Sequence, residues 1–240
     1  MKGLKGKNAI VTGAGGGLGT AISQRLAEAG CSVGIFDLNA EAARSTARSI
    51  GEKASAHTVD ISDLDAVKKA VAEFEEKVGP VDILVNNAGW DKVGNFLETD
   101  KALWEKIVAI NLWGPLHVTH TVAQGMTARG KGKIITIASD AARVGSSGEG
   151  VYSACKGGMV AFSKTLAREL ARKNINVNVV CPGPSDTPIL NDFVGEGEVG
   201  QKIYEGLKRA IPFKRLGQPE DFGGIVAFLA SDEADYITGR

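Results

Sequence analysis

Short apolar runs alternate with amphipathic stretches along most of this chain. The runs at 8–12, 31–36, 54–59, 81–85, 134–138 and 175–180 are short and contain many β-branched residues, which is typical of buried strands. The stretches at 20–29, 40–50, 63–78, 101–127, 153–172, 201–210 and 219–230 carry apolar residues at helical spacing. Strands that alternate with helices predict an α/β fold in three layers, with a doubly wound parallel sheet.

A glycine-rich turn joins the first strand to the first helix. Gly13, Gly17 and Gly19 give the spacing G-x-x-x-G-x-G, and not the commoner G-x-G-x-x-G. Glycines let the backbone approach a pyrophosphate, and the free N–H groups at a helix start can bind it. The turn therefore predicts a dinucleotide site, although glycines also occur in such turns for strand–helix packing alone.

Acidic residues end the second and third strands. A carboxylate such as Asp37 accepts hydrogen bonds from the adenosine ribose and repels a 2′-phosphate, so we expect NAD and not NADP. A solvated turn aspartate is the alternative. Asp60 either contacts the adenine edge or caps the next helix.

Candidate catalytic residues follow the fifth strand. Tyr152 and Lys156 are four residues apart on one helix, so their side chains share a face. We expect the ammonium to lower the pKa of the phenol, and we expect Ser139, at the end of the adjacent strand, to hold an alcohol or carbonyl oxygen. Alone this pair is a weak signal, because Tyr and Lys often meet at this spacing by chance.

Composition narrows the possible partners. Of the 240 residues, 28 are Lys or Arg and 28 are Asp or Glu, so no global charge attracts nucleic acid or an anionic membrane. No apolar run approaches the ~18 residues of a membrane span. The three cysteines cannot all pair internally, which favours the cytoplasm. We expect one domain over 1–240, and small molecules and other subunits as partners.

Taken together in order, these motifs resemble the short-chain dehydrogenase/reductase family over nearly the whole chain. The resemblance implies a Rossmann-type domain with seven parallel strands, NAD-dependent alcohol oxidation and ketone reduction, and no metal. The implied catalytic set is Asn111, Ser139, Tyr152 and Lys156. The predicted cofactor residues are Gly13, Gly17, Leu18, Gly19, Asp37, Asp60, Ile61, Asn87, Ala88, Gly89, Tyr152, Lys156, Pro182, Gly183 and Thr187.

Three features of the helices modify this picture. Pro115 has no N–H for the Asn111 carbonyl, so the helix at 101–127 is expected to be interrupted there. His117 and His120 are read as surface or interface residues, since no third metal ligand is near. Cys155 is read as a packed thiol more readily than as a nucleophile.

The end of the chain departs from the family pattern. From the resemblance we expect the family's seventh strand to be missing, which would leave six strands and put the tail's subunit contact in doubt. A homodimer or homotetramer through the helices at 101–127 and 153–172 is still expected. The glycine-containing segment 189–216 is read as a substrate lid, and its basic residues either form a solvated face or bind phosphate.

The substrate expectation comes from three segments around 86–91, 138–149 and 179–186. They resemble family members that act on a cyclic β-hydroxyacyl-CoA such as 2-hydroxycyclohexanecarboxyl-CoA. The predicted substrate residues are Trp90, Ser139, Val144, Ser146, Ser147 and Glu149, which shape a ring pocket or else pack the loops. The alternatives are a 3-oxoacyl-carrier-protein reductase, a dinucleotide-sensing protein, and a cofactor-binding protein with impaired catalysis.

Overall fold

A sheet of six parallel strands, in the order β3-β2-β1-β4-β5-β6, forms the centre of the molecule. The computed structural model describes residues 1–188, 190 and 197–240. The strands are β1 (Asn8–Thr12), β2 (Ser32–Asp37), β3 (Ala54–Thr58), β4 (Ile83–Asn86), β5 (Gly132–Ile137) and β6 (Ile175–Val180). The predicted three-layer α/β fold, Rossmann-like and in a single domain, is confirmed.

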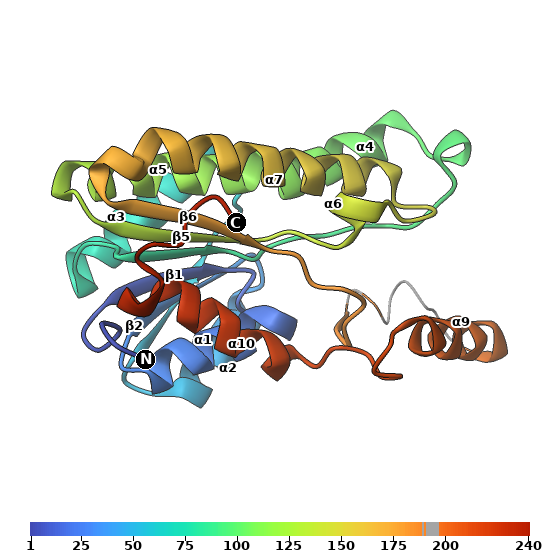
Figure 1. Ribbon diagram of the computed structural model, residues 1–240, viewed down its shortest axis with the longest axis horizontal. Coiled ribbons are helices and arrows are strands. Elements are labelled where there is room, and N and C mark those ends of the chain that lie inside the picture. Colours follow the sequence, from blue (N-terminus) through green and yellow to red (C-terminus); the bar gives the residue numbers. More distant parts are fainter. Residues whose placement is uncertain (189, 191–196) are drawn as a thin grey trace.

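Helices cover both faces of the sheet (Figure 1). One face carries α1 (Gly17–Glu28), α2 (Ala40–Ile50) and α10 (Pro219–Ala230). The other carries α3 (Leu64–Val78), α4 (Lys101–Val108), α5 (Gly114–Arg129), the short α6 (Ala141–Val144) and α7 (Gly150–Leu170). Helix α9 (Gly197–Ala210) lies apart from the sheet, on the right in Figure 1.

The two cores follow from alternation along the strands. Successive side chains of a strand point to opposite faces. Thus Ala9 and Val11 belong to the core under α1 and α10, whereas Ile10 belongs to the core under α3, α5 and α7. Because both faces are covered, apolar residues occupy both sets of positions, which explains why the strands read as continuous apolar runs.

Local signals set where several helices begin. Asn39 accepts hydrogen bonds from the first turn of α2, and Asp63 does the same for α3. The capping alternative for Asp60 is therefore wrong: its carboxylate accepts hydrogen bonds from the amide and hydroxyl of Ser62, in the turn before the cap.

The long helix at 101–129 is interrupted where Pro115 predicts. A π-helical turn, η2 (Ala109–Trp113), separates α4 from α5. Gly114 follows it and packs closely on Ile61, since an added Cβ would lie 2.5 Å from the Ile61 Cδ1. Asn111 is held in this turn and is 1% exposed.

The last residues lie along the outer edge of β6. The Gly239 amide donates to the Val177 carbonyl at 2.8 Å, and the Val179 amide donates to the Arg240 carbonyl at 2.6 Å. Two such bonds extend the sheet's hydrogen bonding without adding an assigned strand. The described residues therefore contain the expected six strands.

Phe74→Ala is expected to destabilise the fold strongly. The ring is fully buried and packs edge-on against Phe36, at 6.3 Å between centroids. Truncation should lower the free energy of unfolding by ~3–5 kcal/mol in urea titration, through lost burial and the cavity left behind. Leu97→Ala, at a side chain that is 94% exposed, is the matched control. Equal losses for the two variants would contradict the core assignment.

Candidate active site

A hollow of about 500 Å³ lies at the carboxyl ends of the central strands. Its walls are the glycine turn after β1, the Asn-Ala-Gly segment after β4, the residues that follow β5 and β6, and the first turns of α7. In the sheet order β3-β2-β1-β4-β5-β6, the connections run in opposite directions on the two sides of the β1–β4 boundary. Such a switch point leaves a crevice at the carboxyl ends of the strands, where ligands bind. Motifs that are far apart in the sequence meet here.

The glycine turn is shaped by close backbone contacts. Gly13 has φ +61°, and an added Cβ there would lie 2.6 Å from the Ala88 Cα. At Gly19 an added Cβ would overlap the Gly13 carbonyl oxygen. A larger residue at either position would push the turn away from β4, so the glycines serve packing as well as access to the hollow.

Asp37 closes the turn from the side of β2. One carboxylate oxygen accepts from the Gly15 amide at 2.8 Å, and the other accepts from the Asn39 amide at 2.8 Å. The residue also borders the hollow. Its carboxylate is thus fixed at the rim, where an adenosine ribose would lie in a dinucleotide site.

Thr12 and Asn87 join the ends of β1 and β4. The Asn87 side chain donates to the carbonyls of Thr12 and Gly13, each at 3.0 Å. The Thr12 hydroxyl accepts from the amides of Asn87 and Ala88, each at 3.1 Å. These four bonds fix the glycine turn relative to the segment that leads to Gly89.

Ser139, Tyr152 and Lys156 border the same hollow. Lys156 is 5% exposed, and its Nζ donates to the Ile137 carbonyl at 3.1 Å. The same nitrogen lies 5.5 Å from the centre of the Tyr152 ring. A hydroxyl, a phenol and a buried amine are therefore grouped where three strands end.

Asn111 fixes the wall behind the lysine. Its Nδ2 donates to the Trp90 carbonyl at 2.6 Å and to the Ile107 carbonyl at 2.9 Å, while its Oδ1 accepts from the Trp90 amide at 3.3 Å. Gly89 passes close by, since an added Cβ would lie 3.1 Å from that Oδ1 and 3.3 Å from the lysine Nζ. The π-helical turn thus reaches the site through its asparagine.

The ionisation of Tyr152 differs from the sequence expectation. Burial raises the pKa of the phenol, and the carboxylates of Glu149 and Asp91 raise it further, while a hydrogen bond with Ser139 opposes the rise. Burial also lowers the pKa of Lys156 to about 8, which weakens the lysine as a source of positive charge. The expected lowering of the phenol pKa is therefore wrong for the chain by itself.

Similar proteins combine this fold and these motifs. A protein-family model described as enoyl-(acyl carrier protein) reductase matches residues 13–240. Nodulation protein G of Azospirillum brasilense is 42% identical over 237 residues, which are 97% of this chain and 94% of that protein. Acetoacetyl-CoA reductase of Allochromatium vinosum is 38% identical over 239 residues, with 96% and 94% covered.

The chain belongs to the short-chain dehydrogenase/reductase family. Two solved structures agree, each with a TM-score of 0.92 and 34% identity. They are 3-ketoacyl-(acyl-carrier-protein) reductase from Brucella melitensis complexed with NADH, covering 99% of this chain and 96% of that one, and an actinorhodin polyketide ketoreductase variant with NADPH, covering 100% and 95%. This short-chain dehydrogenase/reductase is thus an oxidoreductase of alcohols and ketones that uses a nicotinamide cofactor.

Most predicted cofactor residues of this short-chain dehydrogenase/reductase line the hollow, and three do not. Gly19 lies behind the turn, in contact with Gly13 and the Asn87 side chain. Ile61 is 8% exposed and packs against Gly114. Asp60 is exposed, and its adenine role stays a prediction. The predicted residues that line the hollow are Gly13, Gly17, Leu18, Asp37, Asn87, Ala88, Gly89, Tyr152, Lys156, Pro182, Gly183 and Thr187.

The predicted substrate residues divide in the same way. Val144, Ser146 and Glu149 join Ser139 at the rim. Trp90 and Ser147 are outside the lining, and the Trp90 ring instead lies under the Lys106 Nζ, 3.8 Å from the ring centre. Trp90 therefore contributes its backbone to the site through Asn111.

Some lining residues carried no recognised sequence signal. Pro184 and Ser185 directly follow the predicted Pro182-Gly183, and Pro188 directly follows the predicted Thr187, so contiguity could have indicated them. Asp140 and Ala141 follow Ser139 in the same way. Leu207 reaches the rim from α9, and only the tertiary arrangement brings it there. The proposed lid, 189–216, includes 189 and 191–196, which lie outside the described residues.

The remaining candidates have structural roles. His117 pairs with the Ile61 carbonyl at 3.1 Å, and His120 contacts Gln124 on the surface. Cys155 is 3% exposed, and burial raises the pKa of its thiol, which suits a packed residue. Among the described residues, no group of three or more His, Cys, Asp or Glu is arranged around a metal position. None of the helices in the part of the chain that the structure describes combines the length and the apolar character of a membrane span.

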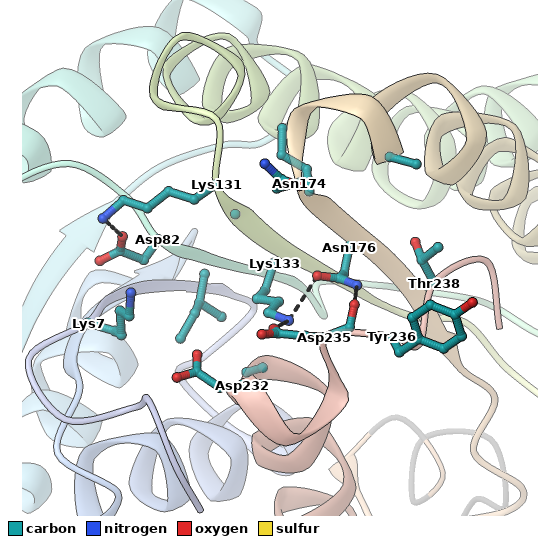
Figure 2. A pocket seen from close by; sticks show the side chains of 15 residues that line it. Lys7, Asp82, Lys131, Lys133, Asn174, Asn176, Asp232, Asp235, Tyr236 and Thr238 are labelled. Carbon is teal, nitrogen blue, oxygen red and sulfur yellow. Dashed lines mark hydrogen bonds and ion pairs between the residues drawn. The ribbon is translucent and has the colours of Figure 1, made fainter.

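A second, larger hollow of about 710 Å³ lies at the opposite, amino ends of β4, β5 and β6 (Figure 2). Its charged groups largely pair with one another. Lys131 contacts Asp82 at 3.6 Å, and Lys133 contacts Asp235 at 2.5 Å and Asn176 at 2.9 Å. These pairs link the strand ends to one another and to the C-terminal segment, and none of the predicted catalytic or cofactor residues borders this hollow. The smaller hollow is therefore the candidate active site.

Gly89→Ala is expected to impair turnover with little effect on folding. The new methyl would crowd both the Asn111 Oδ1 and the Lys156 Nζ. Displacing the lysine by a few tenths of an ångström should lower kcat at least ~10-fold, because reactive groups must keep their orientation. Gly224→Ala is the control, since nothing lies within 4 Å of its added Cβ. Steady-state rates and melting temperatures check this, and a wild-type kcat in Gly89→Ala would contradict it.

Proposed function

We propose that this enzyme interconverts a secondary alcohol and a ketone with NAD as its cofactor. The observation that carries the proposal is the grouping of Ser139, Tyr152 and Lys156 in the hollow that the glycine turn also borders. A phenol and a hydroxyl suit proton transfer to an oxygen that gains or loses charge.

The cofactor fits the residues present. Gly13 and Gly19 have no room for a side chain, so the backbone of the turn is bare where a pyrophosphate would approach. The start of α1 offers free amides to it. We assign Asp37 to the adenosine ribose, and Thr187 and Lys156 to the nicotinamide half. When bound, the nicotinamide supplies the hydride donor or acceptor.

The chain's own residues handle the proton. Ser139 holds the substrate oxygen, and Tyr152 donates a proton to it during ketone reduction or removes one during alcohol oxidation. The buried Lys156 amine, anchored on Ile137, keeps a positive charge near the phenol and the cofactor ribose. Asn111 holds the Gly89–Trp90 backbone that forms the wall behind this amine.

The substrate we rank first is a cyclic β-hydroxyacyl-CoA, such as 2-hydroxycyclohexanecarboxyl-CoA. The segments at 86–91, 138–149 and 179–186 resemble the dehydrogenase of that thioester, and a relative is named for acetoacetyl-CoA. Val144, 77% exposed at the rim, and Leu207 of α9 offer apolar contacts to a ring. A 3-oxoacyl-carrier-protein reductase is the second candidate, favoured by the Brucella structure.

We also propose a homodimer or homotetramer through α4, α5 and α7. Trp113, stacked at 6.1 Å on His117 of α5, is 54% exposed and supports a subunit contact on this side. The segment 189–216 is proposed as a lid over the hollow, and Leu207 at the rim supports this.

We expect at least tenfold tighter binding of NADH than of NADPH. The Asp37 carboxylate, fixed by the Gly15 and Asn39 amides, would repel a 2′-phosphate. Asp37→Ser should reduce the ratio by weakening NADH and admitting NADPH. Fluorescence titration of both cofactors measures this. Equal affinities in the wild-type protein would refute the role given to Asp37.

The substrate proposal is tested by cofactor absorbance against a panel of cyclic and linear hydroxyacyl-CoAs, acyl-carrier-protein thioesters and free alcohols. We expect the cyclic CoA thioester to give the highest kcat/KM. Tyr152→Phe should bind NADH normally and lose at least ~100-fold in kcat, since it lacks the acid–base hydroxyl. Preference for carrier-protein thioesters would favour the second candidate. If the protein binds the cofactor but turns over no compound of the panel, a cofactor-binding protein with impaired catalysis would be indicated.

A further inference from the structure

Asp91, in the loop after β4, is a carboxylate that the mechanism above does not use. Both of its side-chain oxygens are buried and make no hydrogen bond of normal geometry among the described residues. The Lys92 amide stabilises the carboxylate in part, but burial outweighs it. A buried carboxylate with so little hydrogen bonding costs free energy, so its place beside a catalytic site calls for an explanation.

Glu149 is the carboxyl group next to Asp91. Two loops hold the pair together: the Gly94 amide donates to the Gly148 carbonyl at 3.0 Å, and Gly148, with φ +82°, packs on Val93. Two carboxylates offer acceptors alone, which accounts for the missing donor. A hydrogen bond links Asp91 and Glu149 once one of them carries a proton.

Glu149 also stands at the start of the catalytic helix. It occupies the N-cap position of α7 but makes no capping hydrogen bond with its side chain. Tyr152 follows three residues later, on the same face of the helix, and both residues border the hollow. Glu149 therefore borders the same hollow as the phenol, one helical turn before it.

Other charged groups near the pair do not neutralise it in the structure. The Lys106 Nζ lies over the Trp90 ring, and the Lys156 Nζ donates to the Ile137 carbonyl. The other titratable groups of the hollow and of the segments next to it are Lys92, Lys106, Asp140, Arg143, Cys155, Lys156 and Cys181.

We propose that Asp91 and Glu149 form a carboxyl pair that holds Tyr152 in its protonated form, and so favours ketone reduction over alcohol oxidation at neutral pH. This inference rests on the proposed function, because it takes Tyr152 as the acid–base group. Asp91 and Glu149 are positioning residues: they act through the phenol and need not touch the substrate.

The pH range follows from the charges. Burial, with Glu149 nearby, raises the pKa of Asp91 to about 6. Above that pH the Asp91 carboxylate adds its charge to the pair, and two negative charges oppose ionisation of the phenol. Below it, the proton on Asp91 removes one of them. The effect on Tyr152 is therefore largest at neutral and alkaline pH.

The first test is the pH profile of alcohol oxidation. In Glu149→Gln and Asp91→Asn, the pH at which kcat/KM reaches half its alkaline maximum should fall by ~0.5–1 unit, and more in Glu149→Gln, whose charge has the larger effect on the phenol. The ratio of kcat for reduction to kcat for oxidation, each measured at pH 7 with saturating substrate and cofactor, should fall with it. Asp65→Asn, at a side chain that is 90% exposed, is the control and should leave the profile unchanged. Superimposable profiles for all four proteins would overturn the proposal.

The second test needs no substrate. Tyrosinate absorbance during alkaline titration, taken as the difference between each protein and its Tyr152→Phe counterpart, reports the ionisation of residue 152 alone. It should occur at lower pH in Glu149→Gln than in the wild-type background, and an unchanged midpoint would overturn the pair's role. A chain that turns over no substrate would refute the proposed function. The titration would still show whether the carboxyl pair raises the pH at which Tyr152 ionises.

Thermal denaturation gives an independent check on Asp91. Its folded-state pKa is raised from 3.8 to about 6, so the wild-type protein loses stability as the pH rises through that window. Asp91→Asn lacks this loss, so its melting temperature relative to wild type should be higher at pH 8 than at pH 4.5. An equal difference at the two pH values would show that Asp91 is not a buried ionised carboxylate.

Discussion

The burial of the Lys156 amine is the constraint around which the site is built. The side chain comes from α7, crosses to the end of β5 and is anchored on the Ile137 carbonyl at 3.1 Å. A buried amine tolerates little displacement, because it needs its acceptor and loses its solvation. Gly89 leaves room for the amine, and Asn111 fixes the Gly89–Trp90 backbone from the π-helical turn. The end of β5, the loop after β4 and helix α7 therefore have to keep fixed positions relative to one another.

The π-helical turn that holds Asn111 is favoured by a proline in the sequence. Pro115 offers no amide to the Asn111 carbonyl, so the regular hydrogen bonding of a helix cannot continue through that point. The extra residue in the turn directs the Asn111 side chain toward Trp90. A helix without this irregularity would point a different side chain at the loop after β4, and the wall behind Lys156 would be lost.

Charge around Tyr152 is balanced between opposing groups. A hydrogen bond with Ser139 favours its ionisation, whereas burial and the carboxylates of Glu149 and Asp91 disfavour it and raise the pKa of the phenol. The spacing of Tyr152 and Lys156 on one helix predicts only that the amine lowers the pKa of the phenol. The opposing effect of the carboxylates depends on the approach of two loops, joined between Gly94 and Gly148, and the order of residues in the chain does not reveal that approach.

The sequence by itself determined the layers, the strands and the site of the glycine turn, because these depend on periodicity and on glycine, proline and capping residues close together in the chain. It placed β6 and α10 at their observed bounds and indicated the interruption before Pro115. Tertiary structure alone decided that the Trp90 ring lies outside the hollow and that Asp91 lies beside Glu149. These outcomes depend on burial and on distances between residues far apart in sequence, which set solvation and charge and leave no local pattern.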